Sequence, residues 1–351
     1  MRRKSRKKHY KLGKVTPRND VVLSTSSLGE GTVSSKYKKL YHYTDINGLE
    51  GILEKNQLWA SHFHFLNDIQ EIIASRDRIM PIAIEYALRE FAWWKEKEDW
   101  MKVVEENGGY NTVVEHEVTK VFNIITEVTS RLTPPYIVSF ATHATAHELQ
   151  DGSLDLWRAY SKSNNPGYAI VFNTKSLENR MKDELTSHQY HMLHLVDVDY
   201  GSNYLSSTHN FANKMIHMLN GIYETIGLDI SGKTIRIEEM YTNIAITITR
   251  HKNPHFKSEN EVRLVASPPT KESVPSIDIS NARSVFHRKS SGCFVPTVGV
   301  FGDDISDFDI EEIIIGPGEG QETRAEGLRS FLRSRGRSIN IRLSRIPYRA
   351  L

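Results

Sequence analysis

The chain has 351 residues, of which 39% are hydrophobic and 25% are charged, so it can bury a sizeable core under an ordinary charged surface. It has no run of about 18 apolar residues and no apolar segment after its basic start, and we therefore expect neither a membrane span nor a secretory signal. The single cysteine, Cys293, cannot form an internal disulfide or a thiolate zinc site, which fits a reducing cytoplasm.

The chain starts with a basic segment. Its formal net charge is only +2, yet residues 1–39 hold 12 Lys and Arg against 2 Asp and Glu. Such a segment is typical of a contact with nucleic acid, and a solvated tail without a specific role has the same composition. We expect residues 1–38 to be a disordered leader, with residues 2–14 as the candidate nucleic-acid contact. Residues 39–351 are expected to form one domain.

The domain begins with short strands and helices. Residues 40–43 predict a strand, apolar residues at helical spacing between 46 and 53 predict a helix, and residues 58–61 predict a second strand. A long helical block follows at residues 69–132, and Pro81 is expected to interrupt it. Apolar residues at positions 114, 118, 121, 125, 128 and 132 place one stripe on a helix face. We expect this block to be an insertion or a cap.

The second half of the domain is richer in strands. The predicted strands are residues 136–142, 168–173, 191–200, 261–267, 294–300, 310–315 and 339–343, and the predicted helices are residues 154–162, 204–226, 233–251 and 321–335. Strands and helices do not alternate regularly, so a doubly wound dinucleotide fold is not expected. The predicted fold class is α+β, with a mixed, largely antiparallel sheet, flanking helices and the long helical insertion.

Residues 259–265 form the most informative stretch, Glu-Asn-Glu-Val-Arg-Leu-Val. The alternation of a strand places Glu259, Glu261 and Arg263 on one face and apolar residues on the other. We expect the charged face to point to solvent or into a cleft. Paired carboxylates can divide the work of catalysis while a nearby arginine keeps one of them ionised. An exposed Glu–Arg pair without a function fits the same pattern.

Five further residues are candidates for substrate binding. Asn67 and a glutamine three residues later have the spacing of a capping box, which does not need the two acids Asp68 and Glu71. Trp157 and Tyr160 lie three residues apart on a predicted helix and therefore share a face. They could line a wall that stacks a base or a nicotinamide ring, or simply pack in the core.

Two further patterns are only weak indications of a binding site. His143 and His147 have the spacing of two metal ligands on one helix, but no third ligand accompanies them at a telling distance, and we predict no metal site. Residues 316–320, Gly-Pro-Gly-Glu-Gly, lie between a strand and a helix, where either a phosphate cradle or a tight turn fits. The lysine of a P-loop is absent from this segment.

Eight short motifs follow one another along the chain: Leu40-Tyr41-His42-Tyr43-Thr44, residues 67–71, 138–140, 156–160 and 167–172, Lys257 with residues 259–263, residues 313–317, and residues 344–349. In this order they resemble a mainly bacterial family, domain-of-unknown-function family 2971, over residues 38–350. The family often has Asn-Asp-Pro where this chain has Asn67-Asp68-Ile69. It often has a cysteine in place of Val138, so a catalytic cysteine is excluded here.

The opening motif also looks like ADP-ribosyltransferases of the His-Tyr-Glu type. In these enzymes a histidine on a strand before a Gly-x-x-x-Ile-Leu helix grips the nicotinamide ribose, and a late strand brings a catalytic glutamate. The resemblance implies that NAD is the substrate, with His42 and Glu261 at one site beside Tyr41, and with Tyr43 or Tyr160 stacked on the nicotinamide. Cleavage of the nicotinamide–ribose bond builds a cation that a carboxylate stabilises.

Three functions stay open from the sequence. The first is an enzyme that hydrolyses NAD or transfers its ADP-ribose to a protein or nucleic acid, in a bacterial conflict or phage-defence setting. The second is a module that binds or senses nucleic acid through the basic segment. The third is a magnesium-dependent phosphodiester hydrolase with Asp68, Glu71, Glu259 and Glu261 as oxygen ligands.

Overall fold

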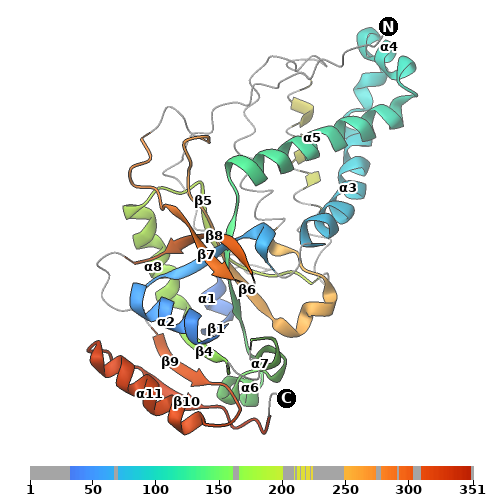
Figure 1. Ribbon diagram of the computed structural model, residues 1–351. Coiled ribbons are helices and arrows are strands. Elements are labelled where there is room, and N and C mark those ends of the chain that lie inside the picture. The colour runs from blue at the N-terminus through green and yellow to red at the C-terminus, as the bar shows by residue number, and fades with distance from the viewer. Residues whose placement is uncertain are drawn as a thin grey trace.

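Figure 1 shows the computed structural model, which describes residues 32–66, 70–160, 166–200, 249–273, 278–290, 292–302 and 310–348 and single positions between 209 and 223. The strands are β1 (Lys39–Thr44), β2 (Leu58–His62), β3 (Tyr136–Ala141), β4 (Tyr168–Asn173), β5 (Met192–Asp197), β6 (Glu261–Ser267), β7 (Val285–Ser290), β8 (Cys293–Val300), β9 (Ile310–Ile315) and β10 (Asn340–Leu343). The α-helices are α1 (Val33–Lys36), α2 (Ile46–Lys55), α3 (Gln70–Glu90), α4 (Glu98–Glu106), α5 (Tyr110–Leu132), α6 (Ala146–Asp151), α7 (Leu154–Tyr160), α8 (Thr174–Ser187) and α11 (Gln321–Ser334). The 3₁₀ helices are η1 (Phe63–Phe65), η2 (Ala92–Lys95) and η3 (Pro254–Glu259).

The strands form one mixed sheet in the order β10-β9-β4-β1-β3-β2-β8-β7, with β6 paired to β3 and β5 paired to β6. Among these strands only β9 and β10 pair in parallel. Helices α2, α8 and α11 cover one face of the sheet with Leu49, Met181 and Leu328, among others. The predicted α+β class, with a largely antiparallel sheet and flanking helices, is confirmed. None of the helices within the described ranges is both long and apolar enough to cross a membrane.

The sheet divides at β3. One edge of β3 pairs with β6 along its whole length, whereas the other edge pairs first with β2 at Tyr136 and Ile137 and then with β1 at Ala141. Strands β1 and β2 therefore share one edge and lead into two leaves, β1–β4–β9–β10 and β2–β8–β7. Backbone groups of β3 between the two pairings need other partners, because a buried carbonyl without a hydrogen bond is costly.

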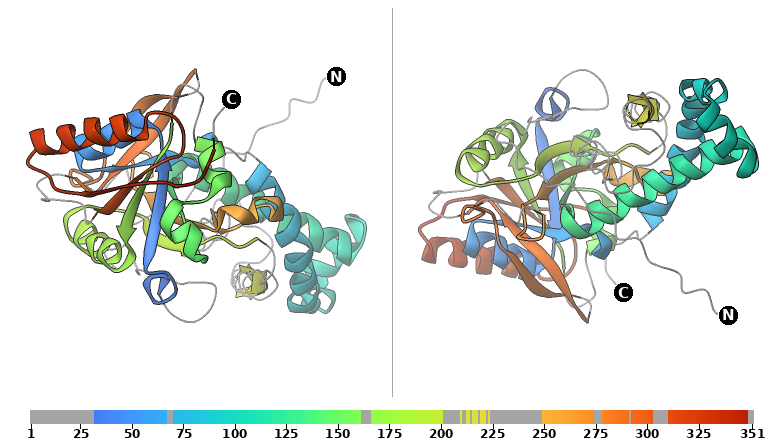
Figure 2. Two further views of the ribbon diagram at one scale, coloured as in Figure 1. Left: turned by 90° about the horizontal axis from the view of Figure 1, so that it is seen from below. Right: turned by 90° about the horizontal axis from the view of Figure 1, so that it is seen from above.

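The helical block packs around an apolar cluster separate from the core of the sheet, and residues between 212 and 223 also contribute to this cluster. Helices α3, α4 and α5 and η2 enclose an apolar cluster that includes Phe91, Trp94, Trp100 and Phe122. In both views of Figure 2 this block lies to one side of the sheet, away from α11. The predicted interruption at Pro81 is wrong, since α3 continues through it. Contacts of the neighbouring turns with the block's core offset the hydrogen bond that a proline removes.

Sequence patterns missed two elements of the sheet layer and made one strand too long. Helix α8 carries few apolar residues, and the edge strand β7 is polar, so neither shows a clear period. The predicted strand at residues 191–200 is shorter in the structure, as β5. The helices predicted at residues 204–226 and 233–251 lie largely outside the described residues.

The fold begins before residue 39. In the four-residue helix α1, Val33 is fully buried, and the backbone N–H and the hydroxyl of Ser34 donate to the carboxylate of Glu178 at 2.9 and 2.6 Å. The boundary predicted between residues 38 and 39 is therefore too late. Four residues are too few to show an apolar period, so the sequence carried no signal for this helix.

Replacing Ser34 with alanine is expected to lower the free energy of unfolding by about 1.5–3 kcal/mol, because it removes the hydroxyl hydrogen bond to the buried carboxylate of Glu178 and leaves only the backbone N–H bond. Urea denaturation measures this loss. The matched control is Ser35→Ala, since the Ser35 hydroxyl is exposed and donates only to the Thr32 carbonyl. We expect this control to change the stability by less than about 0.5 kcal/mol. Equal losses in both variants would contradict the anchoring role of Ser34.

Candidate functional site

Backbone pairing places the charged residues of β6 on the same face of the sheet as Tyr41. Ala141 of β3 pairs with Tyr41 on one side and with Glu261 on the other, and Ser139 pairs with Arg263. Side chains of directly paired residues point to the same face. The face that carries Tyr41, Glu261 and Arg263 is called the second face below, because it lies opposite the face covered by α2, α8 and α11.

The charged side chains of β6 are buried, contrary to the expectation that they point to solvent or into a cleft. Glu261 is 4% exposed and Arg263 is 1% exposed. Residues that follow β5 and precede η3 cover them: Arg263 donates to the Thr249 carbonyl at 2.7 Å, and the Glu261 N–H donates to the Tyr200 hydroxyl at 2.8 Å. The alternation of residues along the strand predicted that Glu261 and Arg263 share a face. It did not predict that other segments bury this face.

Glu259 does not belong to strand β6, although the sequence pattern had placed it on the same strand face as Glu261. It is the last residue of η3, and β6 begins two residues later, at Glu261. Between them Asn260 adopts a left-handed backbone conformation with φ 43°, which asparagine tolerates better than most residues. Its carbonyl accepts from the Thr142 N–H at 2.9 Å. This turn lets the side chain of Glu259 remain partly exposed beside buried Glu261.

One lysine joins the two carboxylates. Arg263 binds Glu261 through Nε at 2.9 Å and Nη2 at 3.0 Å, and Lys252 Nζ donates to Glu261 at 3.0 Å and to Glu259 at 2.6 Å. Burial alone would raise the pKa of Glu261, but the charges of Arg263 and Lys252 outweigh burial and hold it at about 2. Burial would lower the pKa of Lys252, yet the two carboxylates raise it. Glu261 and Lys252 are therefore both charged at neutral pH.

An exposed tyrosine ring lies next to these charges. Tyr160, the last residue of α7, is 38% exposed. Burial of its hydroxyl end raises its pKa to about 12, and the negative charges of Glu261 and Glu259 act in the same direction. Tyr160, Lys252, Glu259, Glu261 and Arg263 are called the Glu261 cluster from here on.

Two buried aromatic residues support the ring of Tyr160. Tyr43 meets Trp157 edge to face, with ring centroids 4.7 Å apart, and lies 6.2 Å from Tyr160. The Tyr43 hydroxyl accepts from the Ser153 N–H and therefore donates to Nε2 of His143, both at 2.9 Å. This network fixes the start of α7 against β1.

Tyr41 serves the same face but not the Glu261 cluster. Its ring lies 4.3 Å from that of His143, and burial raises the pKa of its hydroxyl to about 12. The hydroxyl points to the Leu149 carbonyl of α6. Tyr41 therefore packs beneath α6.

The structure does not bring His42 to Glu261. Because side chains alternate along a strand, His42 lies on the opposite face from Tyr41 and Tyr43. There its ring meets Phe140 edge to face at 5.8 Å, and Nδ1 donates to the Ser139 carbonyl at 2.9 Å. That carbonyl belongs to the part of β3 where β1 and β2 diverge. Burial lowers the pKa of His42, so the imidazole is neutral at pH 7 and supplies a donor to this backbone carbonyl.

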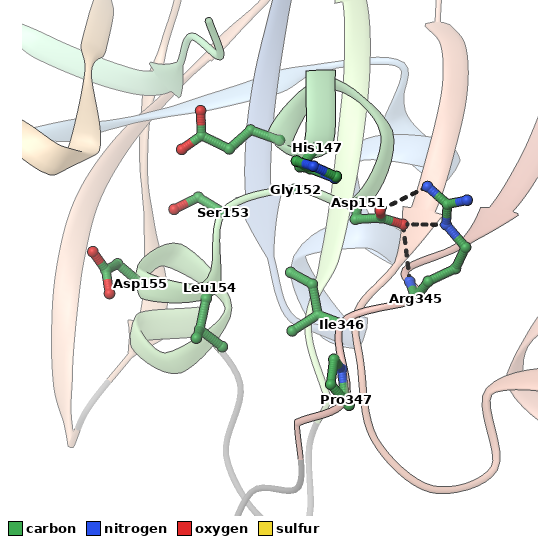
Figure 3. Close-up of a pocket in the computed structure, with 10 residues that line it drawn as sticks. His147, Asp151, Gly152, Ser153, Leu154, Asp155, Arg345, Ile346 and Pro347 are labelled. Carbon is green, nitrogen blue, oxygen red and sulfur yellow. Dashed lines mark hydrogen bonds and ion pairs between the residues drawn. The ribbon is translucent and has the colours of Figure 1, made fainter. Parts of the chain in front are cut away.

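A pocket of about 460 Å³ lies behind the aromatic network, between α6, the start of α7 and residues 345–347. Figure 3 shows the Asp151–Arg345 pair on one side of it and Ser153 and Asp155 on the other. Arg345 binds Asp151 at 2.9–3.0 Å through its backbone N–H and its guanidinium. Charge and hydrogen bonds from Arg345 outweigh burial and lower the pKa of Asp151. The pair ties the segment that follows β10 to the end of α6.

Three of the predicted binding residues stay predictions. Asn67 and Asp68 lie outside the described residues. Glu71 belongs to the first turn of α3, and the position of its side chain is not described.

A magnesium ion does not fit between the two glutamates. The ammonium group of Lys252 occupies the position between Glu259 and Glu261 that a shared metal ion would need. His143 and His147 do not lie on one helix, because α6 begins at Ala146 and only His147 belongs to it. Within the ranges that the structure describes, no three His, Cys, Asp or Glu side chains gather as a metal site would require.

No sequence pattern indicated Lys252 and Tyr200, which both contact Glu261. Lys252 lies between two predicted elements and belongs to no recognisable motif. Tyr200 follows β5 and reaches Glu261 only because β5 pairs with β6. Contacts of this kind depend on the pairing of strands that are far apart in the sequence, so no local pattern could have indicated them.

A family model described as "Protein of unknown function (DUF2971)" matches residues 156–264. The match runs from α7 to β6 and includes Trp157 and every member of the Glu261 cluster, whereas His42 and Tyr43 precede it. No curated protein and no solved structure matches the chain. Over residues 156–264 the chain is therefore similar to the DUF2971 family, as its motifs had indicated.

Proposed function

We propose that the Glu261 cluster cleaves the bond between nicotinamide and ribose in NAD or an NAD-like nucleotide. The observation that carries this proposal is the pairing of an ionised carboxylate, Glu261, with a partly exposed carboxylate, Glu259, beside the exposed ring of Tyr160. Two carboxylates that share one site repel each other, and here Lys252, which is bound to both, compensates the repulsion.

The chemistry suits these groups. As the bond between ribose C1′ and the nicotinamide nitrogen breaks, its electron pair leaves with neutral nicotinamide and positive charge develops on the ribose. Fixed negative charge in a water-poor site stabilises such a cation without reorganisation. Water or an acceptor hydroxyl then bonds to C1′ and loses its proton to Glu259, which is the more exposed carboxylate. Tyr160 offers a ring face for nicotinamide.

In this proposal His42 has a structural role. The resemblance to His-Tyr-Glu type transferases implies a histidine on the nicotinamide ribose, but His42 lies on the other face of the sheet and donates to a backbone carbonyl. Groups on the second face must therefore hold the ribose. The reaction proposed for this chain depends on Glu259, Glu261 and Tyr160 and does not require His42.

The test is nicotinamide release from NAD by the purified full chain and its variants. Glu261→Gln and Glu259→Gln are each expected to reduce release by about 100-fold or more, the usual effect of removing a catalytic carboxylate. Glu272→Gln, on an exposed turn, is the matched control and keeps full activity. Circular dichroism shows whether each variant is folded, which matters most for buried Glu261.

Two results would overturn the proposal. One is the absence of nicotinamide release by the wild-type chain with NAD alone and with a mixture of cellular protein and nucleic acid as acceptor. The other is release that continues unchanged in both glutamate variants. In either case the cluster would be a structural ion-pair network.

A further inference from the structure

A second pocket lies at the edge of the sheet, where β7 and β8 meet the C-terminal end of α8. Its volume is about 350 Å³, and its lining includes Gln57, His188, Asn281, Arg283 and Phe286. No member of the Glu261 cluster lines it. This volume lies within the usual range of small-molecule sites.

The base of this pocket is rigid. Glu184 of α8 is buried and accepts from Arg283 Nε at 2.7 Å, from Arg283 Nη2 at 2.8 Å and from the Tyr190 hydroxyl at 2.6 Å. The Gln189 N–H donates to the Asn281 carbonyl at 3.0 Å. These bonds hold the loop before β7 against α8, so the pocket exists before any ligand binds. They also neutralise the charge of Arg283.

Two glycines make room for a carboxamide. A Cβ atom at Gly299 would lie 2.4 Å from Oε1 of Gln57, and one at Gly302 would lie 2.6 Å from its Cγ. The side chain of Gln57 therefore lies directly against the backbone of the segment 299–302, which a larger residue would prevent. Gln57 and Asn281 give the pocket two groups that can both donate and accept hydrogen bonds.

An aromatic ring forms one wall. Phe286 of β7 is 36% exposed, and the edge-to-face contact with Trp59, at 6.1 Å and 77°, fixes the orientation of its ring. Phe286 is therefore both held in place and accessible to a flat ligand. Such a ring stacks on any base, because every base has a π face.

We propose that this pocket binds a nucleobase. Carboxamides recognise the edges of bases through paired donors and acceptors, and an aromatic wall stacks on their faces. The guanidinium of Arg283 is paired with Glu184, so the lining favours an uncharged, planar and polar ligand over an ion. The base belongs either to a free nucleoside or to single-stranded nucleic acid, and this assignment is independent of the reaction proposed for the Glu261 cluster.

The test uses the fluorescent nucleoside 2-aminopurine riboside, whose emission changes on stacking, with the full chain. Phe286→Ala is expected to raise its Kd at least about fivefold, the lower limit for losing one base–aromatic stack. Asn281→Ala, at an exposed position where folding is not at risk, is expected to raise the Kd as well. Phe294→Ala is the matched control, because this phenylalanine on β8 is 63% exposed and does not line the pocket.

Further arms separate the two sources of the base and the two proposals. A single-stranded oligonucleotide that carries 2-aminopurine binds much more tightly than the riboside if nucleic acid is the ligand, and with similar affinity if a free nucleoside is. Glu261→Gln is expected to leave the binding of both probes unchanged. A loss of NAD cleavage in this variant therefore does not count against the nucleobase pocket. Absence of binding to both probes, or binding that Phe286→Ala and Asn281→Ala leave unchanged, would overturn the assignment.

Discussion

Replacing Arg263 with methionine lowers the free energy of unfolding by about 3–5 kcal/mol, the usual cost of removing one partner of a buried ion pair. The guanidinium of Arg263 makes two hydrogen bonds to the Glu261 carboxylate and one to the Thr249 carbonyl, and both side chains are almost fully buried. Without this guanidinium, Lys252 is the one cation of the Glu261 cluster that still pairs with Glu261. Equilibrium denaturation in guanidinium chloride measures the loss.

Surface and double variants separate this effect from the general cost of removing an arginine. Arg335→Met, which breaks a partly exposed pair with Glu54, is expected to cost at most about 1 kcal/mol. Removing both partners, as in Glu261→Met with Arg263→Met, should recover most of the stability, because two apolar side chains need no charge partner. If the single variant costs no more than Arg335→Met, the pair is not the anchor of β6.

The same ion pair sets a pH dependence. The pKa of Glu261 is lowered in the folded chain to about 2 from a usual value of 4.5. Its contribution to stability is therefore complete above about pH 4.5 and is lost as the pH falls through 2. The wild-type chain should lose stability over this interval relative to Glu261→Gln, and a parallel decline of the two chains would contradict the lowered pKa.

The sequence predicted the individual strands of the sheet better than it predicted how these strands pair. Strands β4, β6 and β9 have the expected bounds, since each is largely buried and bounded by polar or turn residues. Helix α8 and strand β7 were missed because polar residues dominate them. Propensity and period report on burial, so elements at the edge of the fold leave the weakest signal.

The candidate site shows the same limit. That Glu261 and Arg263 share a face follows from their spacing, and the structure has them paired. That His42 and Glu261 lie on opposite faces follows only from the register of β1 against β3 and of β3 against β6. A shift of one residue in either pairing would have reversed the result. Register depends on contacts across the whole sheet, which no local motif records.

Trp157→Ala is the second large effect that we expect, a loss of about 3–5 kcal/mol, because a buried aromatic ring leaves a cavity that its surroundings cannot fill. The indole is fully buried and donates to the Asp151 carbonyl at 2.9 Å. It also lies so close to two glycines that a Cβ atom at Gly152 would be 2.7 Å from its Nε1, and one at Gly316 would be 2.8 Å from its Cε3.

Tyr160→Ala is the control on the same helix, since this ring is partly exposed and its loss should cost less than about 1 kcal/mol. Thermal and denaturant unfolding measure both variants. Gly316→Ala keeps the indole but adds a methyl group that would meet the Gly167 carbonyl at 2.7 Å, so it should also destabilise the chain. If Trp157→Ala costs no more than Tyr160→Ala, the indole does not hold α7 against the sheet. The exposed ring beside Glu259 would then owe its position to some other contact.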